Sequence, residues 1–486
     1  MVDYRSRDEK YAETEAAPIL LTARRKVATT FIVCLAIAMM CLDSAVVNTA
    51  LPRIAVDLHA GLSGLQWVVD AYTLALAAVV LSAGSIGDRR GRRRVFAIGL
   101  AVFTASSLAC ALAPSIGFLD AARAVQGLGG ATMFATGLAI LADAFPPAER
   151  AAPMAAYGAT IGAAYALGPV VGGALTSWLG WRSVFYVNLP LGVLALYGTY
   201  VWLRESRHPH ARRLDWPGQL TFSGGLFLLV FALLRGNTEG WGSALVVVAL
   251  TGAGVLLTAF VVAESVTRTP MLPLRLFARR DFSAVQATQL GISAGFFALY
   301  LYMTLYLQDV LGLSPLHAGL AFLPGTILIF AVSAGSAPLA RRFSPGLLLP
   351  PALAVIAVGT ALLAIVGPHS SWTLILPGFL LACLGTGIVN PVSAALGMSA
   401  GAADDSGLLA GAMDTFRYGG LALGVAVFGA LLPASAGTGH ARAGAFVSGF
   451  HHAVLAGTGI TLAGAVAVLF LIGLTAGHRS ADTGVS

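Results

Sequence analysis

The stretch Gly84-Ser-Ile-Gly-Asp88-Arg89-Arg90-Gly91-Arg92-Arg93-Arg94 separates two long apolar runs in the first quarter of the chain. Its five arginines fall within six residues, and so much charge is costly to move across a lipid bilayer. The stretch therefore predicts a cytoplasmic loop between two membrane-spanning helices. Its glycines permit a tight turn and close helix contact, and Asp88 can pair with an arginine or cap a helix start.

The composition is that of a membrane protein. Of the 486 residues, 57% are hydrophobic and 10% are charged, whereas soluble domains carry about 25% charged residues. The net charge is +7, but the arginines cluster at the ends of apolar runs, which indicates control of membrane topology and not nucleic-acid binding. The four cysteines lie inside apolar runs, so we expect no disulfide framework, no metal site and no cofactor.

The apolar runs predict an all-α protein with about fourteen membrane spans, since a bilayer core of about 30 Å needs about 20 apolar residues per helix. The first run is too long for a signal peptide and is expected to be a retained span. If both termini are cytoplasmic, most Lys and Arg residues fall in cytoplasmic loops and tails. Because basic residues are enriched on the cytoplasmic side of membrane proteins, we expect both termini to be cytoplasmic. The predicted spans are centred near Ala36, Leu76, Phe103, Ala131, Ala164, Val193, Phe227, Leu250, Gly295, Leu328, Ala357, Leu381, Gly420 and Ala463.

A faint internal repeat suggests how the spans are grouped. Ser82-Ala-Gly-Ser85 recurs as Ser333-Ala-Gly-Ser336, and an arginine pair follows each copy, the second being Arg341-Arg342. Parallel repeats of this kind occur in secondary transporters. We therefore expect two six-helix bundles joined by two inserted helices. The predicted boundaries are a cytoplasmic tail at 1–26, a first bundle at 27–203, linkers with two inserted spans at 204–281, a second bundle at 282–474 and a cytoplasmic tail at 475–486.

Four stretches carry a resemblance to a known family. They are Leu42-Asp43-Ser-Ala-Val-Val-Asn48-Thr-Ala-Leu51-Pro52, the Gly84–Arg94 stretch, Arg123-Ala-Val-Gln126-Gly127-Leu-Gly129-Gly130-Ala131, and the run Gly158-Ala-Thr-Ile-Gly162 with Gly168-Pro169-Val-Val-Gly172-Gly173. On these stretches the chain resembles the major facilitator superfamily, and in particular its 14-span drug:proton antiporter group of the QacA/EmrB type. The resemblance covers about residues 27–474.

The resemblance implies roles for two of these stretches. Gly84, Asp88, Arg89, Gly91 and Arg92 match the loop motif of the superfamily and are expected to latch the two halves in one state; the alternative is simple anchoring by positive charge. In the second half, Leu339 stands where the motif has its Asp, so the latch is expected in the first half only. The glycine-rich run, with Gly158, Gly162, Gly168, Pro169, Gly172 and Gly173, resembles the motif that marks proton-exchanging exporters; plain glycine packing is the alternative.

Three ionisable residues lie inside predicted spans, where each costs roughly 2.5–3.5 kcal/mol. Counting 1.5 Å per residue places Asp43, Asp70 and Arg123 at a similar depth in the outer half of the first bundle. We hypothesise that they couple transport to protons, with Asp43 as the carrier. The alternatives are that Asp43 bonds a helix end, that Asp70 faces outer water, and that Arg123 is a structural ion pair.

Asp414 and Arg417 lie three residues apart in the thirteenth span and can share one helical face. Asp414 is a candidate for contact with a cationic substrate, and Arg417 for a gating pair. Aromatic residues such as Tyr165 and Tyr300 are candidates for lining a cavity between the halves, although most aromatic residues in such spans are core or face lipid.

The sequence thus predicts a multi-pass transporter of the bacterial inner membrane with no catalytic residues. We expect it to be a monomer whose partners are a small-molecule substrate, protons and the bilayer. We expect it to export drugs or hydrophobic or cationic natural products in exchange for protons. No P-loop sequence occurs, and a membrane potential supplies about 2.3 kcal/mol per charge per 100 mV. The alternatives are a transporter of a metabolite, siderophore or lipid and, more remotely, a polytopic membrane enzyme or sensor.

Overall fold

The computed structural model describes residues 22–146, 149–207, 215–267, 270–336, 339, 342–400, 406–432 and 440–472. The predicted tail 475–486, nearly all of the tail 1–26, and Arg341 of the second arginine pair lie outside these residues. Within them, 13 helical segments are long and apolar enough to cross a membrane, and α17, with 26 residues, is a fourteenth helix of similar length. The prediction of an all-α membrane protein with about fourteen spans is confirmed.

Every predicted span centre falls within one of these helices. The first half of the molecule, as named here, comprises α2 (Ala23–Asp57), α3 (Leu62–Arg90), α4 (Arg92–Ala111), α5 (Ile116–Ala144), α6 (Ala151–Leu179), α7 (Ser183–Tyr186) and α8 (Asn188–Trp202). The insert comprises α9 (Trp216–Glu239) and α10 (Ala244–Val266), followed by the short 3-10 helix η2 (Leu274–Ala278).

The second half begins with one interrupted span of 31 residues, Arg280–Val310. It runs through α11 (Arg280–Ile292), the π-helical turn η3 (Ser293–Phe297), α12 (Leu299–Leu305) and the π-helical turn η4 (Tyr306–Val310). The other spans of this half are α13 (Pro315–Gly335), α15 (Pro345–Leu362) with η5 (Leu363–Ile365), η6 (Trp372–Ile375) with α16 (Leu376–Ser399), α17 (Ser406–Leu431) and α18 (His440–Ile472).

Local sequence signals set several helix starts. Ser115, Ser243 and Ser314 each precede a helix and accept a hydrogen bond from a backbone N–H three residues ahead, at 3.4, 3.3 and 3.3 Å. A side-chain oxygen at this position satisfies one of the backbone donors that a helix start leaves free. Proline stands in the first turn of α9, α13, α15 and α16, where its missing N–H costs nothing.

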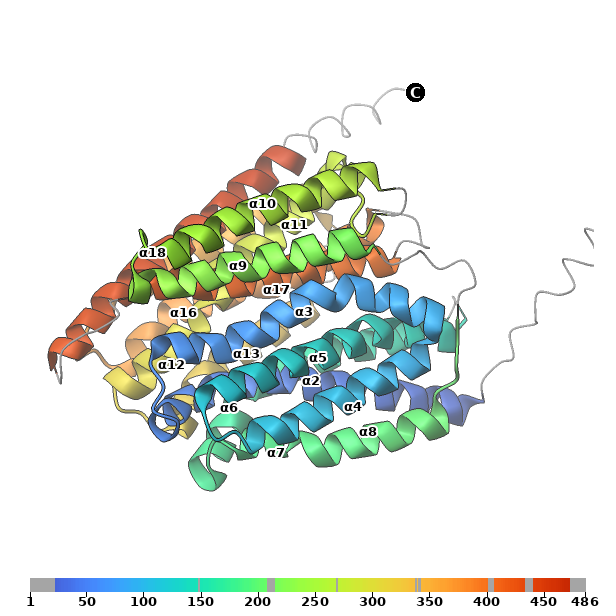
Figure 1. Ribbon diagram of the computed structural model, residues 1–486, viewed down its shortest axis with the longest axis horizontal. Coiled ribbons are helices and arrows are strands. Elements are labelled where there is room, and N and C mark those ends of the chain that lie inside the picture. Colours follow the sequence, from blue (N-terminus) through green and yellow to red (C-terminus); the bar gives the residue numbers. More distant parts are fainter. Residues whose placement is uncertain are drawn as a thin grey trace, which may run out of the picture.

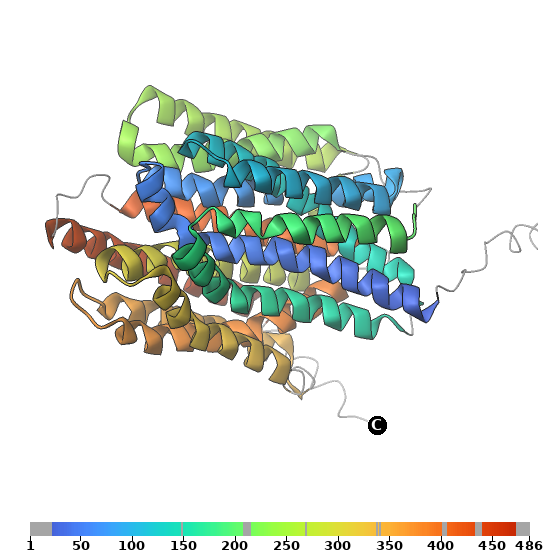
Figure 2. The same cartoon turned by 90° about the horizontal axis from the view of Figure 1, so that it is seen from below.

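The helices run alongside one another, with the insert at one edge of the bundle (Figures 1 and 2). We call the end at which α3 meets α4, at Gly91, the arginine-rich end, and the other the opposite end. At the arginine-rich end Arg25 donates to the carbonyl of Trp202 at 2.9 Å, and Lys26 pairs with Glu149 at 2.7 Å. The start of α2, the end of α8 and the start of α6 therefore also lie there.

Two seams join the halves. At one, α6 packs between α2 of its own half and α13 of the other; at the second, α3 packs against α17, and α9 runs along both (Figure 1). The largest apolar cluster crosses between the halves, joining α2 and α3 residues such as Val46, Ile54 and Leu65 to second-half residues such as Met303 and Phe428. These positions lie toward the opposite end, so the core closes the molecule there.

Candidate functional site

Asp43 and Arg123 form a buried ion pair in the first half. The guanidinium Nη1 of Arg123 lies 2.5 Å from Oδ2 of Asp43, and the two residues are 2% and 1% exposed. The same nitrogen donates to Oε1 of Gln126 at 2.6 Å, and Nε donates to the carbonyl of Val68 at 3.1 Å. The ring of Tyr72 stacks on the guanidinium, 4.1 Å away.

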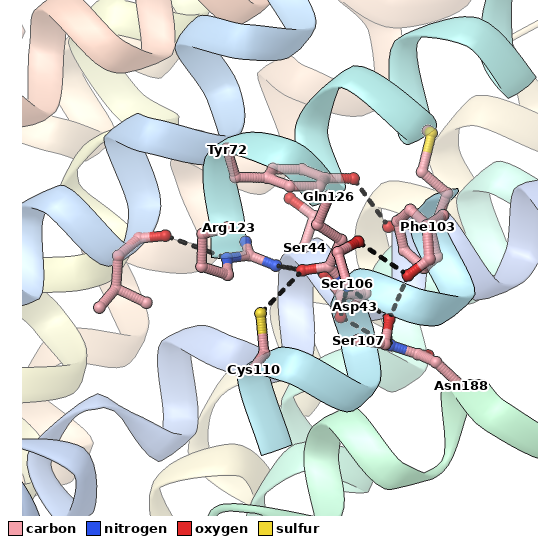
Figure 3. Close-up of polar contacts among 12 residues, drawn as sticks. Asp43, Ser44, Tyr72, Phe103, Ser106, Ser107, Cys110, Arg123, Gln126 and Asn188 are labelled. Carbon is pink, nitrogen blue, oxygen red and sulfur yellow. Dashed lines mark hydrogen bonds and ion pairs between the residues drawn. The ribbon is translucent and has the colours of Figure 1, made fainter. Parts of the chain in front are cut away.

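Neutral polar side chains complete this network (Figure 3). The other carboxylate oxygen of Asp43 accepts from Asn188 at 2.7 Å and from Gln126 at 3.0 Å. Gln126 also donates to Ser107 at 2.8 Å. Asp43 thus has three donors on its two oxygens, so its buried carboxyl group is fully satisfied by hydrogen bonds and one ion pair. The partners come from α2, α3, α4, α5 and α8, so the network ties five helices of one half together.

Asp70 lies elsewhere. Val68 and Tyr72, four residues apart on α3, face Arg123; Asp70, midway between them, lies about 200° around the helix from Val68. It is completely buried, and neither side-chain oxygen has a hydrogen-bond partner among the described residues. The structure therefore joins two of the three predicted ionisable residues and leaves Asp70 on another face of α3, one turn from Gln66.

Gln66 belongs to a contact between the two halves. Its amide donates to the phenol oxygen of Tyr302 at 2.8 Å and to the carbonyl of Val425 at 3.3 Å. Tyr302 in turn donates to the carbonyl of Val425 at 2.5 Å. Asp70 thus shares a helix face with the side chain that links α3 to α12 and α17.

The other hydrogen bonds between the halves lie at the same end or near the middle. Gln308 of η4 donates to the carbonyl of Thr49 at 2.9 Å, and the N–H of Leu316 donates to Ser177 at 3.1 Å. Thr326 donates to the carbonyl of Ala166 at 3.0 Å. Among the described residues, no hydrogen bond joins the two halves at the arginine-rich end.

The Gly84–Arg94 stretch forms the sharp α3–α4 connection, and its charges pair within the first half. Arg92 is held by Asp88 at 2.7 Å and by Asp143 at the end of α5 at 2.5 Å. Gly91 has φ +110°, a conformation that favours glycine, and a Cβ there would lie 2.5 Å from Oε1 of Glu205. The same carboxylate oxygen accepts from the backbone of Arg93 at 3.1 Å. Gly84 lies along α3, and Arg89 is exposed at its end.

The glycine-rich run of α6 divides into two parts. Gly168 and Gly172 lie against α2, where a Cβ on Gly172 would be 2.7 Å from the carbonyl of Val46. Gly173 lies against the start of α13, with its Cβ position 2.9 Å from the Cα of Leu316. Pro169 lies between, with its carbonyl against Gly319 of α13.

The other part of the run is loosely packed. A Cβ on Gly162 would meet only the ring of Phe330, at 3.6 Å, and one on Gly158 would meet nothing. The α6–α13 seam is therefore tight toward the opposite end and opens toward the arginine-rich end.

Asp414 and Arg417 lie in the interior, where α17 approaches α5 and α6. Arg417 lies 5.5 Å from the ring of Tyr165 and 5.5 Å from that of Tyr418, which leads through Phe134 to Tyr157. Asp414 and Arg417 make no direct ion pair with each other, although both are described residues. Tyr300 is not part of this group.

Tyr300 packs instead in a cluster of phenylalanine rings within the second half. Its ring stacks on Phe322 at 5.3 Å and meets Phe379 edge-on at 5.7 Å. The structure therefore separates the two tyrosines that the sequence grouped as candidates for the cavity lining.

Five residues of these two networks were not predicted from the sequence: Ser107, Gln126, Asn188, Gln66 and Tyr302. The position of Gln126, one helical turn after Arg123, could have indicated that it is a partner of that arginine. Asn188 could have been noticed as a polar residue at the start of a span, close to Pro190. The cross-half partners had no local signal, since each lies more than 200 residues from the other in sequence.

Comparisons with known proteins agree with this architecture. A family profile described as Major Facilitator Superfamily matches residues 33–425. Among solved structures, the bacterial homologue of the human lysosomal transporter Spinster has a TM-score of 0.66 at 15% identity, over 93% of this chain and 98% of that one. The human organic anion transporter MFSD10 has a TM-score of 0.61 at 17% identity, over 91% and 99%. At these identities the likeness establishes the fold.

Curated relatives are closer in sequence. The multidrug resistance protein Stp of Mycobacterium tuberculosis (strain ATCC 25618 / H37Rv) is 38% identical over 404 residues, covering 82% of this chain and 74% of Stp. The puromycin resistance protein pur8 of Streptomyces alboniger is 37% identical, covering 79% and 78%. The cephamycin export protein CmcT of Amycolatopsis lactamdurans is 36% identical, covering 84% and 85%.

Proposed function

The chain belongs to the major facilitator superfamily, a family of membrane transporters of small molecules, and from this premise we propose that it exports drugs or natural products in exchange for protons. The relatives at 36–38% identity are named for multidrug resistance, puromycin resistance and cephamycin export. Their match over about four fifths of this chain is the observation that carries the proposal. We assign it to the bacterial cell membrane, with the arginine-rich end and both termini in the cytoplasm.

Two buried carboxyl groups in different settings support proton coupling. Asp43 is balanced by Arg123 and two amides, whereas Asp70 has neither a hydrogen-bond donor nor an ion-pair partner among the described residues. A buried carboxylate without a partner is expensive, so Asp70 is best accommodated as the neutral acid in this conformation. Asp43 was the carrier hypothesised from the sequence; the contacts favour Asp70, with the Asp43–Arg123 pair as the fixed charge framework beside it.

The position of Asp70 gives its ionisation a mechanical consequence. It shares a face of α3 with Gln66, which bonds Tyr302 and Val425 across the seam. Loss of its proton would place an uncompensated charge against this closed seam, and opening the seam to water would relieve the cost. Protonation from the outside and release to the cytoplasm would thus alternate with opening of the two ends.

The Gly84–Arg94 stretch would serve this cycle as a brace. Its ion pairs join the cytoplasmic ends of α3, α4 and α5 and the segment after α8. These ends then move as one body when the halves rock. The latch between halves that the resemblance implies would need partners in a second conformation.

Reconstituted transport tests the proposal. Purified protein in liposomes should drive a drug such as puromycin against its gradient when a pH difference and a membrane potential are imposed, and transport should stop when an uncoupler collapses both. Each proton that crosses with the potential contributes about 2.3 kcal/mol per 100 mV. Transport at the same rate after uncoupling would contradict proton drive. Failure to move puromycin or any compound of a broad drug panel, in a sample shown to be folded, would contradict drug export.

A further inference from the structure

Arg417 differs from Arg123, a buried arginine of the first half, in having no acceptor in the part of the chain that the structure describes. Arg123 donates to Asp43, Gln126 and Val68. Arg417 forms no hydrogen bond or ion pair with any described residue, and its polar atoms are not among those sealed from solvent. Its side chain keeps part of its surface accessible although it lies between α5, α6 and α17. A guanidinium in this position presents unused donors to an internal space.

Asp414, one turn earlier on α17, also has an ionisable group that is not paired with any described residue. It is partly accessible and has no hydrogen-bond or ion-pair partner among the described residues. The two residues therefore present a cationic and an anionic group, side by side, on one face of the helix.

A tyrosine hydroxyl near this charge pair is also unused. Tyr157 is 5% exposed, and its hydroxyl has no hydrogen-bond partner among the described residues. Its ring is joined through Phe134 to that of Tyr418, which lies 5.5 Å from the guanidinium of Arg417. Burying a hydroxyl without a partner is costly. An unused hydroxyl beside an unpaired charge pair indicates a place where a ligand supplies the missing contacts.

The surrounding rings define the shape of that ligand. Phe134 lies 6.2 Å from Tyr157 and 6.4 Å, edge-on, from Tyr418. Aromatic walls favour a flat ring system. A guanidinium binds carboxylate or phenolate groups in a fork, while a carboxylate binds an amine or a delocalised cation.

We infer that this group, Asp414, Arg417, Tyr157, Tyr418, Tyr165 and Phe134, recognises amphoteric aromatic compounds, which carry an acidic and a basic group on a flat ring system. The inference rests on the export function proposed above and specifies its substrate class. Because the two protein charges sum to zero, a ligand with both charges leaves neither of them unpaired. A purely cationic compound would leave Arg417 desolvated without an acceptor.

Three xanthene dyes form a matched probe set for protein in lipid nanodiscs, with binding followed by fluorescence anisotropy. Rhodamine B carries a carboxylate and a cation, its ethyl ester carries the cation alone, and fluorescein carries only negative charge. Wild-type protein should bind rhodamine B about tenfold to a hundredfold more tightly than the ester, the range expected for one charge-assisted contact. Equal affinity for rhodamine B and the ester, or binding of none of the dyes, would overturn the inference.

Two substitutions assign the preference to residues. Arg417→Gln should reduce the ratio between rhodamine B and its ester to about one, while Asp414→Asn should weaken both rhodamines and strengthen fluorescein binding. Arg235→Gln is the matched control, since Arg235 pairs with Glu239 on α9, and it should leave the ratio unchanged. A wild-type ratio in folded Arg417→Gln protein would also overturn the inference. Dye binding is measured without a proton gradient, so the two proposals can fail separately. If the protein exports drugs in exchange for protons but binds rhodamine B and its ester equally, only the substrate class is contradicted. If it prefers rhodamine B but shows no proton-driven export, only the proposed function is contradicted.

Discussion

The side-chain amide of Gln66 donates to the phenol oxygen of Tyr302 at 2.8 Å, and so links the first half to the second. Both groups are buried, and the hydroxyl of Tyr302 donates a hydrogen bond to the carbonyl of Val425. The link therefore contributes to the closed seam and has to break whenever the halves separate at this end.

Replacing Tyr302 by Phe should favour opening at this end. The substitution removes one acceptor and one donor from the seam, and a hydrogen bond contributes about 0.5–1.5 kcal/mol net. The open population should rise several-fold. Distances between spin labels at the ends of α6 and α13 would report it. Tyr306→Phe is the control, because that hydroxyl bonds Gly367 within the second half at 2.7 Å; an equal shift in both variants would show that the seam contact is not responsible.

Gly173→Ala should impair transport, whereas Gly158→Ala should not. A methyl group on Gly173 would collide with the backbone at Pro315 and lie 2.9 Å from the Cα of Leu316, so α6 and α13 could not close. A methyl on Gly158 meets nothing, and alanine in a helix interior is favoured over glycine by about 1 kcal/mol. Transport rate and thermal stability measured on both variants check this. Similar losses in the two would contradict a role for packing at the seam.

Asp70→Asn should uncouple export from protons while leaving the fold intact. The amide has nearly the shape of the neutral acid and needs no counter-charge in a site that provides none. Substrate binding should persist, and proton movement driven by substrate should fall to the background of empty liposomes. A pH-sensitive dye inside the liposomes measures this. Normal substrate-driven proton flux in the variant would assign the carrier elsewhere, Asp43 being the next candidate.

Arg123→Gln should destabilise the protein more than the double variant Asp43→Asn/Arg123→Gln. Removal of one partner from a buried ion pair leaves the other charge uncompensated, at a cost of about 3–5 kcal/mol. Removal of both charges spares that cost and leaves Gln126 and Asn188 as neutral partners. Unfolding transitions in detergent would rank the variants. If the double variant were as unstable as the sum of the single ones, the two charges would not act as a pair.

The sequence was sufficient for the spans and for placing Asp43 and Arg123 at one depth, because apolar length and position along a helix can be read from the chain itself. It was not sufficient for Asp70. The depth of Asp70 along α3 could be predicted, but the direction in which its side chain points could not. That direction is set by the packing of Arg123, from α5, on Val68 and Tyr72. Tyr165 and Tyr300 show the same limit: both are aromatic residues in spans, and only the packing of the halves assigns one to Arg417 and the other to a phenylalanine cluster.

The attachment of α9 at its two extremities limits the freedom of the whole transporter. Near its start, Gln219 donates to the carbonyl of Ala78 on α3 at 2.6 Å; near its finish, Asn237 donates to carbonyls at the end of α17, that of Ala430 at 2.6 Å. The helix is thus bound to both halves along the α3–α17 seam, so the halves cannot part on that side unless α9 moves with one of them and gives up its bonds to the other.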